Sequence, residues 1–166
     1  LLNGRCMINL VFLDDERLPE NVTWARYPEH LPIILRNFKE FSHFADQIKE
    51  EDLANMVFSF DHDLQDFNED GSENTGLTCA KYLVESLQAN GIDCRGKVEW
   101  FVHSQNVCGK KNIADYLQDE VDPFESCDGC GHTGPDVYHD GYGFNICRTN
   151  GCTQYSVRGL SPWDFL

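Results

Sequence analysis

The sequence predicts an α/β fold in which helices and a mostly parallel sheet form a three-layer sandwich. Four short apolar runs, each the length of a buried strand, stop abruptly at polar residues. Stretches whose apolar residues recur at the spacing of an amphipathic helix lie among them. Strands that alternate with helices in this way are typical of parallel sheets. The apolar runs are far shorter than the roughly 18 residues of a membrane-spanning helix, so we expect no membrane segment.

The first strand is expected at Ile8 to Leu13, where the apolar run meets the polar stretch Asp14 to Arg17. The following segment is predicted to be a loop because its prolines exclude a long helix: Pro19, Pro28 and Pro32. A second strand is expected over Ile33 to Phe38. After it, aromatic and aliphatic residues at helical spacing predict an amphipathic helix to about Glu51.

The third strand is expected at Met56 to Phe60, and a loop rich in polar residues and glycine follows it. This loop leads into a helix for which Thr75 is a suitable N-cap and Gly91 a suitable stop. Val98 to Val102 is predicted to form the fourth strand.

A break in composition near Val121 to Glu125 divides the chain. One more short helix is expected before it, with apolar positions at Ile113, Tyr116 and Leu117. Beyond the break the chain is rich in Gly, Cys, Asp and Asn and has no helical periodicity. We therefore predict two domains, residues 7–122 and residues 123–166.

The charge of the chain limits its partners. The 28 acidic and 13 basic residues give a formal net charge of -15, which repels polyphosphate chains at long range. A long nucleic-acid duplex is therefore not expected as a partner. A small phosphate compound, or the end of a single strand, remains compatible if a bound cation reverses the local field. Four cysteines are scattered and four are clustered near the C-terminus, which favours a reducing, cytoplasmic location.

Reactive side chains follow three of the four predicted strands. In a parallel sheet of order 2-1-3-4, the ends of these strands are adjacent, so we expect one shared site. Crowded carboxylates require a neutralising cation, for which Mg²⁺ or Mn²⁺ suits oxygen ligands, and a histidine can move a proton. Each motif alone can also be a capping or solvated loop. The residues are Asp14 and Asp15 after the first strand, Asp61, His62 and Asp63 after the third, and His103, Ser104 and Asn106 after the fourth.

Five motifs occur in order over roughly residues 7–120: Phe12 to Arg17 with Pro19, Leu35 to Phe38 with Phe41, Ser59 to Leu64, Thr75 with Gly76, and His103 to Val107 with Gly109 and Asn112. Together they resemble the cyclic-phosphate processing receiver-like domains. The resemblance implies a receiver-like, flavodoxin-like fold and a phosphodiesterase role on cyclic phosphates, either a cyclic nucleotide or a 2′,3′-cyclic phosphate end of RNA. Val107 stands where the family usually has proline.

The resemblance also implies roles for individual residues. Asp14, Asp15 and Asp61 match the acidic pocket in which receivers hold a divalent ion. A signalling receiver phosphorylated at Asp61 stays open as an alternative, although no convincing fifth strand bearing a lysine is visible. Our expected catalytic residues are His62, His103, Asp61 and Asp63, and our expected substrate-binding residues are Arg17, Ser104, Asn106 and Lys110.

The clustered cysteines predict a zinc-ribbon-like module. Four thiolates suit tetrahedral Zn²⁺ in a closed, structural site, and neighbouring glycines permit tight turns. His132 or His139 could replace one ligand, and disulfides or free thiols are the alternative. A non-catalytic, zinc-containing adaptor is therefore a further interpretation of the chain. The expected ligands are Cys127, Cys130, Cys147 and Cys152.

Overall fold

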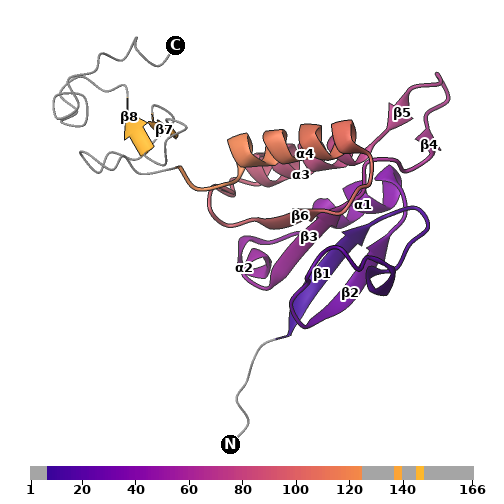
Figure 1. The fold of residues 1–166 in the computed structure, drawn as a ribbon, viewed down its shortest axis with the longest axis horizontal. Coiled ribbons are helices and arrows are strands. Elements are labelled where there is room, and N and C mark those ends of the chain that lie inside the picture. Colours follow the sequence, from indigo (N-terminus) through magenta and orange to yellow (C-terminus); the bar gives the residue numbers. More distant parts are fainter. Residues whose placement is uncertain (1–6, 125–136, 140–144, 148–166) are drawn as a thin grey trace, which may run out of the picture. The chain divides into compact units, whose positions relative to one another are not determined.

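The computed structural model describes residues 7–124, 137–139 and 145–147. The chain divides into two compact units, Leu1–Asp122 and Pro123–Leu166. The first unit is an α/β domain (Figure 1). Among the described residues, no helix is long and apolar enough to cross a membrane.

The central sheet has four parallel strands in the order β2-β1-β3-β6. They are β1 (Ile8–Leu13), β2 (His30–Leu35), β3 (Met56–Phe60) and β6 (Glu99–Val102). The predicted α/β class and the predicted order of the four strands are confirmed. The strands that carry the expected site residues are therefore neighbours.

The predicted bounds of the second strand are wrong. Strand β2 begins at His30 and ends at Leu35, so it contains Pro32, which we had placed in the preceding loop. A proline lacks the N–H that a central strand needs, but β2 lies at the edge of the sheet and pairs with β1 alone. Its position at the edge explains why Pro32 is tolerated.

Helices cover one face of the sheet (Figure 1). These are α1 (Phe38–Ala45), α2 (Glu50–Leu53), α3 (Gly76–Ala89) and α4 (Val107–Glu120). The predicted helix to about Glu51 is thus two separate helices, and the last helix is longer than expected. The predicted N-cap of α3 is confirmed, because the Thr75 hydroxyl accepts a hydrogen bond from the Thr78 amide.

A loop covers the other face of the sheet. Leu10, Phe12 and Val57 are buried there beneath Val22 and Tyr27, which lie in the segment after the short 3-10 helix η1 (Pro19–Asn21). In the part of the chain that the structure describes, no helix forms this third layer, so the three-layer expectation is corrected. The prolines of this segment account for the absence, since they interrupt any long helix.

Two short hairpins complete the described elements. The loop after β3 contains β4 (Asp66–Phe67) and β5 (Glu73–Asn74), an antiparallel pair that we did not predict. In the second unit, β7 (Val137–His139) pairs with β8 (Asn145–Cys147). Three of the expected zinc ligands, Cys127, Cys130 and Cys152, lie outside the described residues together with His132. The zinc module stays a prediction.

Candidate active site

Asp14, Asp61 and His103 lie in one row across three neighbouring strands. Each directly follows its strand, and backbone hydrogen bonds extend the sheet by that one residue. The amide of Asp61 donates to the Leu13 carbonyl oxygen at 2.9 Å, and the amide of His103 donates to that of Phe60 at 3.0 Å. The sheet itself therefore holds these residues in register.

The same three side chains share one face because side chains alternate along a strand. Phe12 faces the loop-covered side, and Asp14 is two residues further along. Ser59 and Asp61 are related by the same offset of two residues. One potential ligand atom from each of Asp14, Asp61 and His103 lies within 4.8 Å of the others, and all three residues are buried.

Both oxygens of Asp14 are engaged in hydrogen bonds. Oδ1 accepts from the backbone amides of Glu16 at 2.9 Å and Arg17 at 2.7 Å, and Oδ2 lies 3.0 Å from His103 Nε2. Burial by itself raises the pKa of this carboxyl, but the bonds from His103 and the two amides outweigh it and hold the pKa well below 3.8. Asp14 is therefore ionised, and a proton on His103 Nε2 donates to it.

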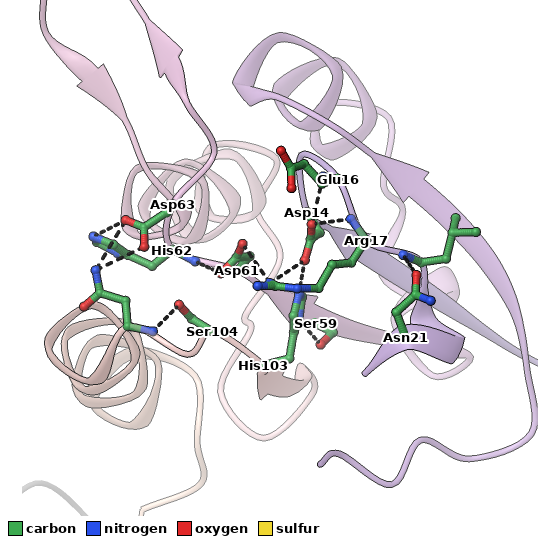
Figure 2. A network of polar contacts seen from close by, with 12 residues as sticks. Asp14, Glu16, Arg17, Asn21, Ser59, Asp61, His62, Asp63, His103 and Ser104 are labelled. Carbon is green, nitrogen blue, oxygen red and sulfur yellow. Dashed lines mark hydrogen bonds and ion pairs between the residues drawn. The ribbon is translucent and has the colours of Figure 1, made fainter. Parts of the chain in front are cut away.

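The guanidinium of Arg17 connects the two buried carboxylates. Its Nη1 lies 3.2 Å from Asp14 Oδ2 and 3.5 Å from Asp61 Oδ2. Arg36 holds the same loop in place, since its Nη1 donates to the carbonyl oxygens of Asp14 and Arg17 at 2.9 and 2.6 Å. We call Asp14, Asp61 and His103, with the Arg17 guanidinium, the inner cluster (Figure 2).

His103 is fully buried and is hydrogen-bonded at both ring nitrogens. Its Nδ1 lies 2.7 Å from Ser59 Oγ, which lies 2.7 Å from the Tyr27 hydroxyl. Burial raises the pKa of Tyr27, so the phenol keeps its proton and can donate to Ser59. The His103 ring also stacks on Phe12, with centroids 4.5 Å apart. A continuous chain of hydrogen bonds thus leads from Tyr27 through Ser59 and His103 to Asp14.

His62, Asp63 and Asn106 form a second set, which we call the outer group, to one side of the inner cluster (Figure 2). The Asn106 side-chain amide donates to both Asp63 oxygens at 3.2 and 3.3 Å, and His62 Nε2 lies 4.0 Å from Asp63 Oδ1. His62 Nδ1 is buried and has no hydrogen-bond partner in the described part of the chain. The ring packs on Gly109, where an added Cβ would lie 2.2 Å from His62 Cγ.

A polar cavity of about 140 Å³ borders both groups. Arg17, Ser104 and Asn106 line it, whereas Lys110 is exposed on α4 and is not among its lining residues. Neither His62 nor His103 lines it directly. The complete lining is Asp14, Asp15, Glu16, Arg17, Asp61, Asp63, Gln65, Ser104, Gln105 and Asn106.

The donor atoms around this cavity fit a hard divalent cation. Acidic residues dominate the lining, and Arg17 is its one cationic side chain. Burial first, and then the negative charge of Asp14, raises the pKa of Asp15, as expected for a carboxyl short of positive neighbours. Asp14 accepts three hydrogen bonds and contacts Arg17, whereas Asp61 accepts one from the His62 amide and lies 3.5 Å from Arg17. Asp15 and Asp61 therefore have more capacity for an ion than Asp14 has.

Gly76 is required for the position of Asp61. Its amide donates to the His62 carbonyl oxygen at 2.9 Å. A Cβ at residue 76 would lie 1.8 Å from the Asp61 carbonyl oxygen, which is a backbone atom that cannot rotate away. Only glycine permits this close approach between the start of α3 and the end of β3.

Neither Ser59 nor Tyr27 was among the expected site residues, although Ser59 begins one of the five motifs. Ser59 carries a usable signal, because it is a hydroxyl residue within the otherwise apolar strand β3, and a buried hydroxyl requires a partner. Tyr27 carries no such signal, since it lies in a loop without periodicity.

Comparison with known proteins gives one finding. The family described as the cyclic-phosphate processing receiver domain matches residues 9–119, which include every residue of the inner cluster and the outer group. No curated protein and no solved structure matches the chain.

Proposed function

The chain belongs to the cyclic-phosphate processing receiver domain family, and from this membership we propose that it is a metal-assisted phosphodiesterase that opens a cyclic phosphate. The substrate would be a cyclic nucleotide or a 2′,3′-cyclic phosphate end of RNA. One observation carries the proposal: Asp14, Asp61 and His103 come within 4.8 Å of one another next to an acidic cavity that also contains Arg17.

Asp15 and Asp61 would hold the divalent ion, with the charge of Asp14 beside them. When bound, Mg²⁺ or Mn²⁺ supplies positive charge that polarises a phosphoryl oxygen and lowers the pKa of a water molecule. The raised pKa of Asp15 supports this assignment, because a carboxylate that lacks a cationic partner gains most from an added cation.

Arg17 would bind the phosphate. A guanidinium has five N–H donors, and only Nη1 is used by the two buried carboxylates in the contacts described above. The remaining donors suit phosphoryl oxygens. Ser104 and Asn106 line the same cavity and would donate further hydrogen bonds. The acidic cavity thus requires both a metal ion and Arg17 to accept an anion.

The outer group would transfer the protons. Hydrolysis joins a water oxygen to phosphorus and breaks one ester P–O bond, so the water loses a proton and the leaving oxygen gains one. Asp63 lines the cavity and His62 lies 4.0 Å behind it, so these two can exchange a proton with the reacting groups. We assign His103 a different role, namely to hold Asp14, because its ring is fully buried and both nitrogens are bonded.

Hydrolysis of a panel of cyclic nucleotides with Mg²⁺ or Mn²⁺, followed by ³¹P NMR, tests the proposal. We expect turnover by the wild type and a decrease of roughly 100-fold or more in Asp61→Asn, which removes one carboxylate from the site. The matched control is Asp115→Asn, since Asp115 is exposed on α4 and pairs with Lys111 away from the cavity.

Two results would contradict the proposal. Equal rates in the wild type and in Asp61→Asn would show that the acidic row does not act in hydrolysis. A stable gain of one phosphoryl group from acetyl phosphate, seen by intact mass and lost in Asp61→Asn, would instead indicate a signalling receiver.

A further inference from the structure

Trp24 presents its ring to solvent while its polar edge is fixed. The indole Nε1 donates to the His103 carbonyl oxygen at 2.9 Å, and the residue is 45% exposed. It lies in the loop that covers the sheet face below the inner cluster. Because the protein already satisfies its N–H group, the surface that the indole leaves exposed is mainly the apolar, aromatic part of the ring.

Arg17 connects this ring to the acidic cavity. Its guanidinium carbon lies 5.9 Å from the centre of the Trp24 ring, and its Nη1 lies 3.2 Å from Asp14. Arg17 also lines the cavity. A single side chain therefore spans the distance between a fixed aromatic surface and the place proposed for a phosphate. A ligand that joins an aromatic ring to a phosphate through a sugar has this combination of groups.

Because the chain is strongly acidic, an aromatic surface would help it to bind an anionic ligand. With a formal net charge of -15, the protein does not attract an anionic substrate from a distance. Stacking of a base on an aromatic side chain adds roughly tenfold to a hundredfold in affinity, and it depends little on net charge. A stacked base would offset the electrostatic cost of bringing a phosphate to an acidic cavity.

We propose that Trp24 is a stacking surface for a nucleobase. Both substrates proposed above, a cyclic mononucleotide and the end of an RNA, carry a base, and Trp24 would be the residue that binds it, so a base-free sugar phosphate would be a poorer substrate. This inference rests on the proposed function for the position of the phosphate and extends it to the rest of the substrate.

The test compares Trp24→Ala with Trp24→Phe on substrates with and without a base. The substrates are 2′,3′-cyclic AMP and glycerol 1,2-cyclic phosphate, and the measured quantity is the ratio of their kcat/KM values. We expect this ratio to decrease about tenfold in Trp24→Ala and to stay within about twofold of the wild type in Trp24→Phe. A phenyl ring still stacks but cannot donate to the His103 carbonyl oxygen.

The ratio separates stacking from a structural effect. If Trp24 only holds the backbone of His103, both variants lose the same hydrogen bond, both substrates are affected equally, and the ratio does not change. That result would overturn the inference. A ratio that falls equally in both variants would overturn it as well.

A calorimetric measurement of binding separates this inference from the proposed hydrolysis. With 3′-AMP as the probe, and inorganic phosphate for comparison, we expect Trp24→Ala to weaken only nucleotide binding. That pattern would support the stacking surface even if no cyclic phosphate is hydrolysed. Failure of the wild type to bind 3′-AMP would overturn it. A comparison of kcat/KM between a short oligoribonucleotide with a 2′,3′-cyclic end and 2′,3′-cyclic AMP shows whether the RNA end or the mononucleotide is the preferred substrate.

Discussion

The inner cluster and the outer group border the same cavity but differ in how firmly they are held. In the inner cluster, Asp14 accepts two backbone hydrogen bonds and contacts Arg17 and His103, and the ring of His103 is bonded at both nitrogens. In the outer group, Asp63 is exposed, and His62 lies 4.0 Å from it with an Nδ1 that has no hydrogen-bond partner among the described residues. The difference indicates that the inner cluster is pre-organised, whereas Asp63 of the outer group is open to the cavity and to solvent.

This division matches the two tasks of the proposed reaction. Fixed charges stabilise a transition state best when they do not have to reorganise during the reaction, and the hydrogen-bonded row at the sheet edge meets that condition. Proton transfer instead needs groups that can reach solvent and substrate and can change their protonation. The fixed charges lie in the row at the strand ends, whereas the groups proposed for proton transfer, His62 and Asp63, lie in the loop after β3.

Asp14→Ala should produce the largest effect and gives the strongest test of the comparison. It leaves the buried His103 and the guanidinium of Arg17 without their carboxylate, which should lower the free energy of unfolding by about 3 kcal/mol. Turnover should be lost as well. Urea denaturation and the rate of cyclic-phosphate hydrolysis measure the two quantities.

Asp63→Ala is the matched variant in the outer group. Because Asp63 is exposed, its removal should change the free energy of unfolding by no more than about 0.5 kcal/mol, while turnover decreases roughly 100-fold. If Asp63→Ala destabilises the protein as much as Asp14→Ala does, the two parts of the site are not distinct.

The sequence alone predicts the inner cluster well and the outer group less well. Asp14, Asp61 and His103 each follow an apolar strand directly, and alternation along strands places them on one face. Strand order then makes them adjacent. The position of His62 depends on the tight packing of α4 against the loop after β3, for which a single sequence has no periodic signal. For this reason the sequence identified His62 but not its distance from the inner cluster.

The covering loop was the least predictable part of the fold. Its prolines exclude a long helix, but nothing in its composition shows that Tyr27 reaches Ser59 or that the loop replaces a layer of helices. The edge strand illustrates the same limit, because Pro32 is compatible with a strand only once its neighbours are known.

His62→Gln should sharpen the comparison by removing proton transfer alone. Glutamine can still form hydrogen bonds but cannot take up and release a proton, so kcat should decrease roughly 100-fold. Gly109→Ala provides an independent check, because its Cβ would force the His62 ring to move while alanine favours the helix. We expect an intermediate loss of about tenfold. Wild-type rates in both variants would exclude His62 from the reaction.

Tyr27→Phe should produce the smallest effect, because it acts on the inner cluster only through Ser59. The variant keeps the aromatic contacts with Phe12 and Phe101 and loses the hydroxyl that lies 2.7 Å from Ser59. The loss of this hydrogen bond should cost about 1 kcal/mol in the free energy of unfolding and lower kcat a few-fold.

The specific readout is ¹⁵N NMR of the imidazole of His103. Without the donor, Ser59 can orient its proton differently, so the population of the His103 tautomer with its proton on Nε2 should decrease. An unchanged tautomer population together with an unchanged kcat would show that the hydrogen-bond chain ends at Ser59 and that the inner cluster is independent of the Tyr27 hydroxyl.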